Sequence, residues 1–314
     1  MPGSTLTLDE SRLRLVPGPR STRGELSVSV RSSQGGVHTL TLPEGVQVQD
    51  VRIDGAVQPV DPGRREIDVP LAPGTRQVAI EWLADGAMEG LYRTPAVDLG
   101  AESVNANVEL VPDAGRWLLW VQGPALGPAI LYWGVLLFVL AAALALSRIA
   151  WLPVKWWQWL LLGAGLGTGN LWTMLPVVAW FLLVGARARL PADGSKAAFN
   201  LAQIAIVLAT PVLLWALVEG VRTGLLGHPD MQVAGNGSTT GLLSRYADRS
   251  GPIAPQATVI SVPLLAYRLL MLAWALWLAF SVIGWLRWGW RGFTTGGAWR
   301  RIAWKRKKAQ TEAG

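Results

Sequence analysis

Residues 129–146 decide the fold; they read AILYWGVLLFVLAAALAL and contain no charged side chain. With its flanks the run reaches about 20 residues, the length that a helix needs to cross the hydrocarbon core of a bilayer. It follows residues 124–128, PALGP, where the alternating pattern of the preceding sequence ends. The stretch therefore predicts a membrane-spanning helix and a boundary between two domains.

Three further apolar stretches follow the first. Backbone groups in lipid must bond to one another, so each stretch predicts helix. One of them, residues 157–186, is longer than a single span needs, so it either crosses once or folds back as a hairpin or re-entrant pair. We expect a transmembrane helical domain over residues 124–290, a bundle of four to five spans with an outer loop at 223–258. Its predicted spans are about 128–147, 157–186, 200–222 and 259–286.

Residues 1–123, before the boundary, show a different pattern. Apolar residues fall at every second position in several short segments, which is the period of half-buried strands. Turn sequences such as Asp54-Gly55 and Pro73-Gly74 separate the segments. Short strands at such spacing favour an antiparallel β-sandwich, Ig-like in general shape. The predicted fold class is thus a β-sandwich followed by transmembrane helices.

Charge is distributed unevenly along the chain. Acidic residues outnumber basic ones up to Ala125, whereas Arg and Lys predominate afterwards and raise the sequence pI to about 10.2. The positive charges flank apolar runs, so we expect a lipid bilayer as partner and no nucleic acid. The chain contains no Cys, which excludes disulfides and thiolate chemistry. The basic tail, residues 291–314, is interpreted as a lipid-headgroup anchor or a plain stop-transfer signal.

Tryptophan is concentrated in the second part of the chain. Seventeen of the eighteen Trp residues lie at or after Trp117, most of them near the ends of predicted spans. Indole prefers the headgroup level of a membrane, so most of these side chains are expected in interfacial belts. For some the alternative is the core of the bundle. These are Trp180, Trp215, Trp274 and Trp277.

The basic tail predicts a cytoplasmic C-terminus. The β-sandwich then lies outside if residues 157–186 fold back, and inside if they cross once. Acidic residues precede the first span and basic residues follow it, which favours a sandwich on the periplasmic side. Export requires a signal that the N-terminal residues do not show, so we expect the chain to be the C-terminal part of a longer precursor or to begin further upstream.

Several short motifs carry a resemblance to a protein family. They are residues 42–46 (LPEGV), 51–55 (VRIDG), 73–74 (PG), 92–99 (YRTPAVDL) and 127–128 (GP). Over roughly residues 40–180 the chain resembles the membrane-proximal, C-terminal part of large uncharacterised bacterial envelope proteins. The resemblance implies a bacterial inner membrane and an extracytoplasmic sandwich, and it implies no chemistry.

Two charges lie inside predicted spans, where an unpaired charge is costly. Glu219 and Arg268 could form a pair, either as a gate lining a polar pathway or as a structural contact between two helices. Asn200 and Gln203 are expected to be hydrogen-bond partners between helices. A further group of small and polar residues is expected to serve helix packing or a tight turn. It consists of Gly163, Gly165, Gly167, Gly169 and Asn170.

The sequence shows no constellation typical of an enzyme. Its two histidines, His38 and His228, lie far apart in a predicted strand and a predicted loop, so we expect no catalytic triad, metal site or cofactor. We interpret the chain as a membrane-anchored protein whose sandwich binds an envelope partner or a second copy. The alternative is a subunit of a transporter or export complex, with Glu219 and Arg268 along its pathway.

Overall fold

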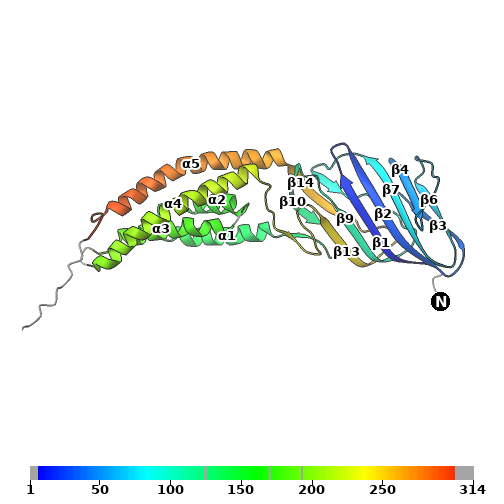
Figure 1. Ribbon diagram of the computed structural model, residues 1–314, viewed down its shortest axis with the longest axis horizontal. Helices are drawn as coiled ribbons and strands as arrows, with labels where there is room; N and C mark the ends of the chain where they lie inside the picture. Colours follow the sequence, from blue (N-terminus) through cyan, green and yellow to red (C-terminus); the bar gives the residue numbers. More distant parts are fainter. Residues whose placement is uncertain (1–5, 124–125, 170, 192–193, 301–314) are drawn as a thin grey trace, which may run out of the picture. The chain divides into compact units, whose positions relative to one another are not determined.

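The structure is a computed structural model that describes residues 6–123, 126–169, 171–191 and 194–300. The chain forms two compact units (Figure 1). The β-unit contains residues up to 134 together with 228–267, and the helical unit contains residues 135–227 together with those from 268 onward. The chain therefore passes between the two units three times. A mixed β and α protein with a sheet-rich N-terminal part is confirmed.

Seven strands form the largest sheet of the β-unit. In order across the sheet they are β13 (Leu243–Ser250), β9 (Ser103–Leu110), β1 (Leu6–Pro17), β2 (Ser21–Ser32), β7 (Gly74–Asp85), β4 (Val46–Ile53) and β5 (Ala56–Val57). Buried and exposed residues alternate along the long strands, as the sequence predicts. One face of the sheet is consequently apolar and buried, and the other is polar.

Three smaller sheets complete the β-unit. They pair β10 (Arg116–Gln122), β14 (Thr258–Pro263) and β8 (Leu91–Arg93); β3 (Gly36–Thr41) and β6 (Glu66–Leu71); and β11 (Ala129–Ile130) and β12 (Val233–Ala234). One apolar core joins the large sheet to β3, β6, β10 and β14. This two-layer arrangement makes the unit sandwich-like. Representative core residues are Leu15, Val28, Leu40, Val69, Leu118 and Val259.

The large sheet differs from a purely antiparallel sandwich at one pair of strands. β9 lies parallel to β1, with Leu13 beside Val108 and Leu15 beside Leu110. A parallel pair needs a long crossover, and here the chain passes through β3, β6 and β8 of the other layer before it returns. The sequence pattern gives the period of the strands but not their direction, so the antiparallel prediction is wrong at this pair.

Most of the predicted outer loop, residues 223–258, is part of the β-unit: residues 228–258 belong to it, and residues 223–227 belong to the helical unit. β13 pairs with β9, and β14 pairs with β10, so this segment adds a strand to each of two sheets. The buried positions Leu243 and Arg245 lie one strand period apart. Many Gly and polar residues mask this alternation in the sequence. The strand partners lie more than 100 residues earlier, which local patterns cannot reveal.

Arg245 fixes β13 to the chain just before the first helix. Its Nη1 donates to the carbonyl oxygen of Gly123 at 3.0 Å, and burial lowers the pKa of its guanidinium. A Cβ atom on Gly127 would lie 2.6 Å from Nη1 of Arg245. The absence of side chains at these glycines therefore lets the arginine lie against the backbone. The predicted boundary at residues 124–128 falls partly on residues 124–125, which lie outside the described residues.

The helical unit is built from five helices and one 3₁₀ turn in the described part of the chain. They are α1 (Tyr132–Ser147), α2 (Trp156–Gly167), η1 (Leu171–Thr173), α3 (Met174–Ala188), α4 (Lys196–Leu226) and α5 (Leu264–Thr294). The predicted basic tail begins inside α5, and residues 301–314 lie outside the described residues.

Two of the described helices, α4 and α5, are long and apolar enough to cross a membrane, judged by length and composition. The prediction of four to five such spans is therefore wrong. α1, α2 and α3 contain 16, 12 and 15 residues. Residues 129–130 pair with β12 instead of extending α1, and β14 takes the first residues of the predicted fourth span. Backbone pairing thus shortens apolar runs that composition alone reads as continuous helix.

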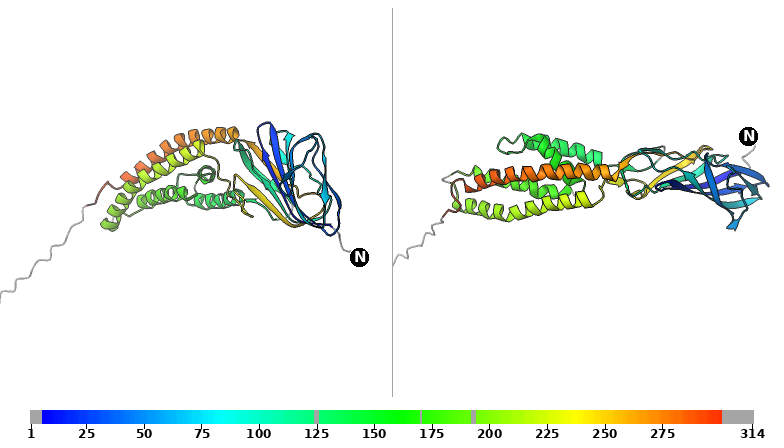
Figure 2. Two further views of the ribbon diagram at one scale, coloured as in Figure 1. Left: turned by 45° about the vertical axis from the view of Figure 1, so that its right-hand side comes forward. Right: turned by 90° about the horizontal axis from the view of Figure 1, so that it is seen from above.

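Residues 157–186 form two helices that fold back on each other. The rings of Trp159, early in α2, and Phe181, in the middle of α3, have centroids 5.2 Å apart. Trp151, just before α2, packs on Gly185 near the end of α3. The start of α2 therefore lies beside the end of α3, so the two helices are antiparallel. α4 and α5 extend beside each other along the unit (Figure 2).

Aromatic side chains form a cluster around Phe181. Ring centroids of Trp180 and Trp285 lie 5.1 and 5.4 Å from that of Phe181, and those of Trp277 and Trp285 lie 6.0 Å apart. Trp159 and Trp285 are buried, which corrects their predicted place in an interfacial belt. Contacts between α2, α3 and α5 provide the apolar surroundings that a position near the end of a span does not reveal.

Candidate functional site

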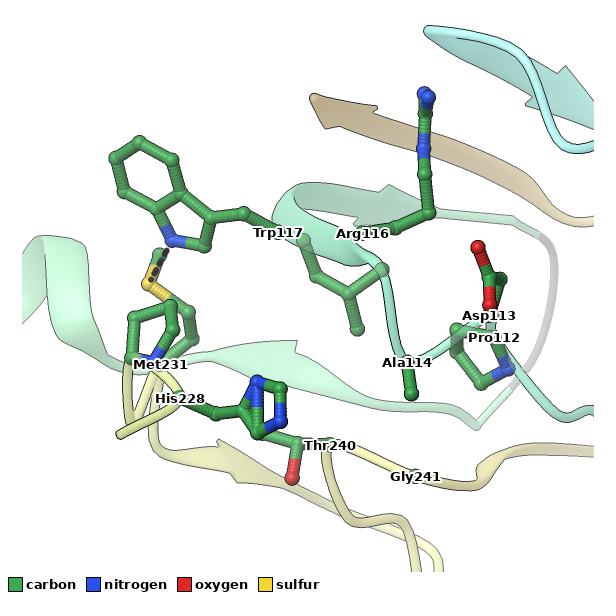
Figure 3. Close-up of a pocket in the computed structure, with 11 residues that line it drawn as sticks. Pro112, Asp113, Ala114, Arg116, Trp117, His228, Met231, Thr240 and Gly241 are labelled. Atoms are coloured by element: carbon green, nitrogen blue, oxygen red, sulfur yellow. Dashed lines mark hydrogen bonds between the residues drawn. The ribbon is translucent and has the colours of Figure 1, made fainter. Parts of the chain in front are cut away.

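A hollow of about 200 Å³ lies beside the start of β10 in the β-unit (Figure 3). Two chain segments that are more than 100 residues apart form its walls. Most of its lining is apolar, and a carboxylate, an imidazole, a guanidinium and a hydroxyl group are added to it. The lining residues are Pro112, Asp113, Ala114, Arg116, Trp117, Leu118, His228, Pro229, Met231, Thr240 and Gly241.

Hydrogen bonds tie the walls of the hollow to the first residues of α1 and α5. Nε1 of Trp117 donates to Sδ of Met231 at 3.0 Å, and the ring of Trp117 packs edge-on against Tyr267 at 5.2 Å. The backbone N–H of Tyr132 donates to the carbonyl of Met231, and that of Leu264 donates to the carbonyl of Gly115. The hollow is therefore held in place where these two helices begin.

The guanidinium of Arg116 bonds to the neighbouring strand β14. Its Nε donates to Oγ of Ser261 at 3.1 Å and its Nη2 to the carbonyl oxygen of Ser261 at 3.0 Å. Figure 3 shows its guanidinium turned away from His228. This leaves Asp113, His228 and Thr240 as the polar groups open to the hollow. A carboxylate, an imidazole and a hydroxyl can hydrogen-bond a small polar ligand.

Sequence reasoning missed this hollow. Pro112-Asp113 and His228-Pro229 each read as ordinary turns, and the prediction for His228 was an isolated loop position. The pairing of β13 with β9 and the hydrogen bond between Trp117 and Met231 bring the two turns to one place. In the described residues, no group of three or more His, Asp or Glu side chains is placed to hold a metal ion.

A buried cation in the helical unit forms a second polar site. Arg187, at the end of α3, is 2% exposed. Its Nε donates to Oε1 of Gln203 at 3.1 Å, Nη1 donates to the carbonyl of Thr295 at 2.6 Å, and Nη2 donates to those of Phe293 and Gly297 at 3.0 Å. Carbonyls at a helix C-terminus lack helical donors and carry partial negative charge. They therefore stabilise the guanidinium in place of a carboxylate.

Asn200 and Gln203 complete this arrangement, which we call the C-terminal clasp: Arg187, Asn200 and Gln203 with residues 293–300. Asn200 and the backbone of Arg300 exchange two hydrogen bonds of 2.8 and 2.9 Å. Gln203 donates to two carbonyls of residues 293–298. Gln203 bonds to α3 and α5, as predicted for a partner between helices, whereas the partner of Asn200 lies beyond the end of α5. The central role of Arg187 was missed because Arg187 lies just outside the predicted span 157–186.

The predicted contact between Glu219 and Arg268 is replaced by another. The carboxylate of Glu219 accepts from Nε and Nη2 of Arg222 at 2.9 and 2.7 Å. Arg268 is exposed, and it makes no ion pair within the described residues. Arg222 lies one helical turn after Glu219, so the nearer cation on the same helix takes the carboxylate. Arg222 lies at the very end of the predicted span 200–222, and the prediction did not consider it as a partner of Glu219.

The glycines of α2 lie at close helix contacts. A Cβ atom on Gly163 would overlap Val139 of α1, and one on Gly165 would overlap the indole of Trp274 on α5. Gly167 is buried, and a Cβ on Gly169 would lie 2.9 Å from Oγ1 of Thr223. These positions let three helices approach α2 and the turn after it. Asn170 lies outside the described residues.

Comparisons with known proteins give partial structural matches only. No protein-family model and no curated protein matches the sequence. Among solved structures, an M1 zinc metallopeptidase from Deinococcus radiodurans matches with 15% identity and a TM-score of 0.31, over 39% of this chain and 35% of the other. A mutant of that enzyme bound to a Tyr-Ser-Ala substrate gives 16% and 0.30 over the same shares. The chain thus spans about a third of these enzymes, and similarity at this level carries no argument about its fold or activity.

Proposed function

We propose that the chain is a membrane-anchored protein of the bacterial envelope whose β-unit binds or positions a partner. The observation that carries this proposal is the contrast between the two units. The β-unit buries its apolar side chains in a core of its own, whereas α4 and α5 expose theirs. Helices with exposed apolar side chains are suited to a lipid environment. The bacterial inner membrane is proposed from the sequence resemblance alone.

Exposed apolar residues occur along the full length of both long helices. Buried residues make up only 28% and 22% of their most apolar stretches, so these helices differ from the core helices of a water-soluble protein. On α4 the exposed residues include Leu201, Val207, Leu208, Trp215 and Val218, and on α5 they include Leu269, Leu272, Leu276, Phe280 and Ile283.

Basic residues support an orientation with the β-unit outside the cytoplasm. They gather at those helix ends that do not lead into the β-unit, which positive-inside topology favours on the cytoplasmic side. The antiparallel α2 and α3 keep the loops before and after them on one side. The residues concerned are Arg148, Lys155, Arg187, Arg189, Lys196, Arg287 and Arg291.

The polar face of the large sheet is the surface proposed for the partner or a second copy. A row of charged residues crosses it, in which Arg14 lies between Glu109 and Glu25, and Glu25 lies beside Glu81. A hollow of about 240 Å³ is lined by these four residues and their neighbours. Exposed charges of both signs can pair with a polar partner and fix its register.

Cysteine labelling tests the anchor and its orientation, because the chain has no Cys of its own. Val57, exposed in the β-unit, and Ala197, exposed at the start of α4, are each replaced by Cys in the full chain. We expect carbonate-resistant membrane association, with a membrane-impermeant maleimide labelling V57C from the periplasmic side and A197C only in inverted vesicles. Release by carbonate contradicts the anchor, and the reversed labelling pattern contradicts the orientation.

Site-specific photo-crosslinking tests the partner surface. A photoreactive residue at Ala79, exposed in the hollow of the large sheet, is compared with one at Val37, exposed on β3 in the other layer of the β-unit. We expect a discrete crosslinked product in intact membranes from position 79 and none from position 37. Equal products from both positions, or none from either, count against this surface.

The alternative, a subunit of a transporter or export complex, rested on Glu219 and Arg268 facing each other across a pathway. With Glu219 bound to Arg222 on its own helix, that motivating contact is gone. A membrane-anchored binding protein is therefore the function that we propose.

A further inference from the structure

A crevice of about 410 Å³ lies between α4 and α5 in the helical unit. Its mouth is formed by exposed residues of both helices, with Val207 58% and Trp290 67% exposed. This places the opening on the apolar flank of the two long helices rather than inside the bundle. The lining residues are Trp180, Ile206, Val207, Thr210, Pro211, Leu286, Gly289, Trp290 and Phe293.

Two residues account for the space. Pro211 lies inside α4, where it removes a backbone hydrogen bond and bends the helix. Gly289 on α5 presents no side chain, and a Cβ there would lie 2.5 Å from the ring of Trp180. Trp180 therefore forms the floor of the crevice against the backbone of α5. A proline on one wall and a glycine on the other keep it open.

The interior offers its occupant no free polar side chain. Nε1 of Trp180 donates to Oγ1 of Thr210 at 3.0 Å, and Oγ1 of Thr210 donates to the carbonyl of Ile206 at 2.8 Å. The polar side-chain atoms of Trp180 and Thr210 are thus bonded within the protein, and the indole N–H of Trp290 lies at the exposed mouth. The complementary occupant is an apolar chain, since a polar ligand would lose its hydrogen bonds to water without replacement.

The volume of the crevice and the charged residues nearby indicate which kind of apolar chain it binds. At about 30 Å³ per small group, the crevice holds on the order of a dozen methylene groups, part of one acyl chain. Arg287 and Arg291 are exposed on α5 close to Trp290 in sequence. Cations at the end of an apolar helix attract anionic headgroups. A phospholipid with an anionic head satisfies both features.

We propose that this crevice binds one acyl chain of an anionic membrane phospholipid. The proposal rests on the proposed anchoring of α4 and α5 in a membrane. Its chain lies between Val207 and Trp290 over the floor made by Trp180, and its headgroup lies near Arg287 and Arg291. The site is a lateral lipid site, opened by Pro211 and Gly289.

The test uses two single-cysteine variants of the full chain. Val207→Cys lies in the crevice, and Val212→Cys lies on the same helix, exposed but outside it. Labelling by a small apolar maleimide is followed in detergent with and without dioleoylphosphatidylglycerol. We expect the phospholipid to slow labelling of V207C several-fold and to leave V212C unchanged. Equal rates at V207C with and without phospholipid overturn the proposal.

Filling the crevice gives an independent measurement. Val207→Trp should lower the amount of phosphatidylglycerol retained through detergent exchange several-fold, whereas Val212→Trp should retain as much as the native chain. Equal retention by both variants overturns the proposal. Carbonate extraction of the same variants separates the membrane anchor from the acyl-chain site. Release of the protein from the membrane refutes the anchor itself. If the protein stays in the membrane but phospholipid does not slow the labelling of V207C, only the acyl-chain site is refuted.

Discussion

Arg187 shows how single residues hold the helical unit together. A buried guanidinium normally needs a carboxylate, yet its hydrogen bonds go to backbone carbonyls at the end of α5 and to Gln203. Phe199 lies against it, with its ring centroid 4.0 Å from Cζ of Arg187. The guanidinium thus caps the C-terminus of α5, where the last carbonyl groups have no backbone N–H donor within the helix.

Replacing Arg187 with Met removes a donor from the carbonyls of Thr295 and Gly297, while that of Phe293 still accepts from Gln203. We expect the last turn of α5 to loosen, because each unsatisfied carbonyl costs about 1–3 kcal/mol. Hydrogen exchange of residues 293–300 should therefore become faster than in the native protein. Arg189→Met is the control, since Arg189 is exposed and its guanidinium lies over the ring of Trp151. Unchanged exchange in R187M would show that the C-terminal clasp does not hold the end of α5.

Phe181 is the centre of the aromatic cluster and is fully buried. Phe181→Ala should destabilise the protein by about 3–5 kcal/mol, because the cavity removes contacts with several tryptophan rings at once. Phe280→Ala, at a position that is 76% exposed, should change stability little. Thermal unfolding in detergent compares the two variants. A similar small loss in both would contradict a cluster packed around Phe181.

At the scale of the element, hydrophobic patterns identified most segments but not their ends. The alternation of Leu26, Val28 and Val30 correctly predicted β2, since the period of a strand is a local property. Helix ends depended on distant partners: residues 129–130 pair with β12, so α1 starts at Tyr132. The two polar sites were missed for the same reason, because each joins segments about 100 residues apart.

The close approach of α2 and α5 depends on Gly165. Gly165→Ala places a methyl group into the indole of Trp274, so α2 and α5 must separate, and we expect a loss of about 1–3 kcal/mol. Gly284→Ala is the matched control on α5, where a Cβ meets no atom within 4 Å. That change should be neutral or stabilising, because Ala favours helix by about 0.5–1 kcal/mol. The unfolding temperature of G165A should fall, whereas that of G284A should stay equal or rise; an unchanged unfolding temperature in G165A argues against close packing at Gly165.

At the scale of the molecule, the β-unit is discontinuous in sequence. Residues 228–263 supply β13 to the large sheet and β14 to the smaller one. The composition change near residue 124 predicts a border that lies ahead of the one between the two units, which falls between Gly134 and Val135. It could not reveal that the chain returns, because a strand read in isolation carries no sign of which strand it will pair with.

A fragment ending at residue 123 should therefore fail to form the native sheet. It lacks the partner of β9 on one edge and the partner of β10 in the other layer, so apolar residues such as Val108 and Leu118 lose cover. Joining residues 6–130 to 228–263 by a flexible linker should restore it. Amide dispersion in NMR spectra and cooperative urea unfolding distinguish the two fragments. A cooperatively folded shorter fragment would show that the second segment is dispensable.

This discontinuity sets an order of events during synthesis. The ribosome makes strands β1 to β10 first, but α1 to α4 must emerge before the strands that complete both sheets. Until Pro263 has been synthesised, the first segment waits with an uncovered edge at β9 and another at β10, exposed to mispairing. If the β-unit lies on the periplasmic side of the membrane, its two segments must be exported separately. One is exported before the helices between them are inserted, and the other afterwards. Completion of the sheet is then a checkpoint, because it reports that α4 has been inserted in the right direction.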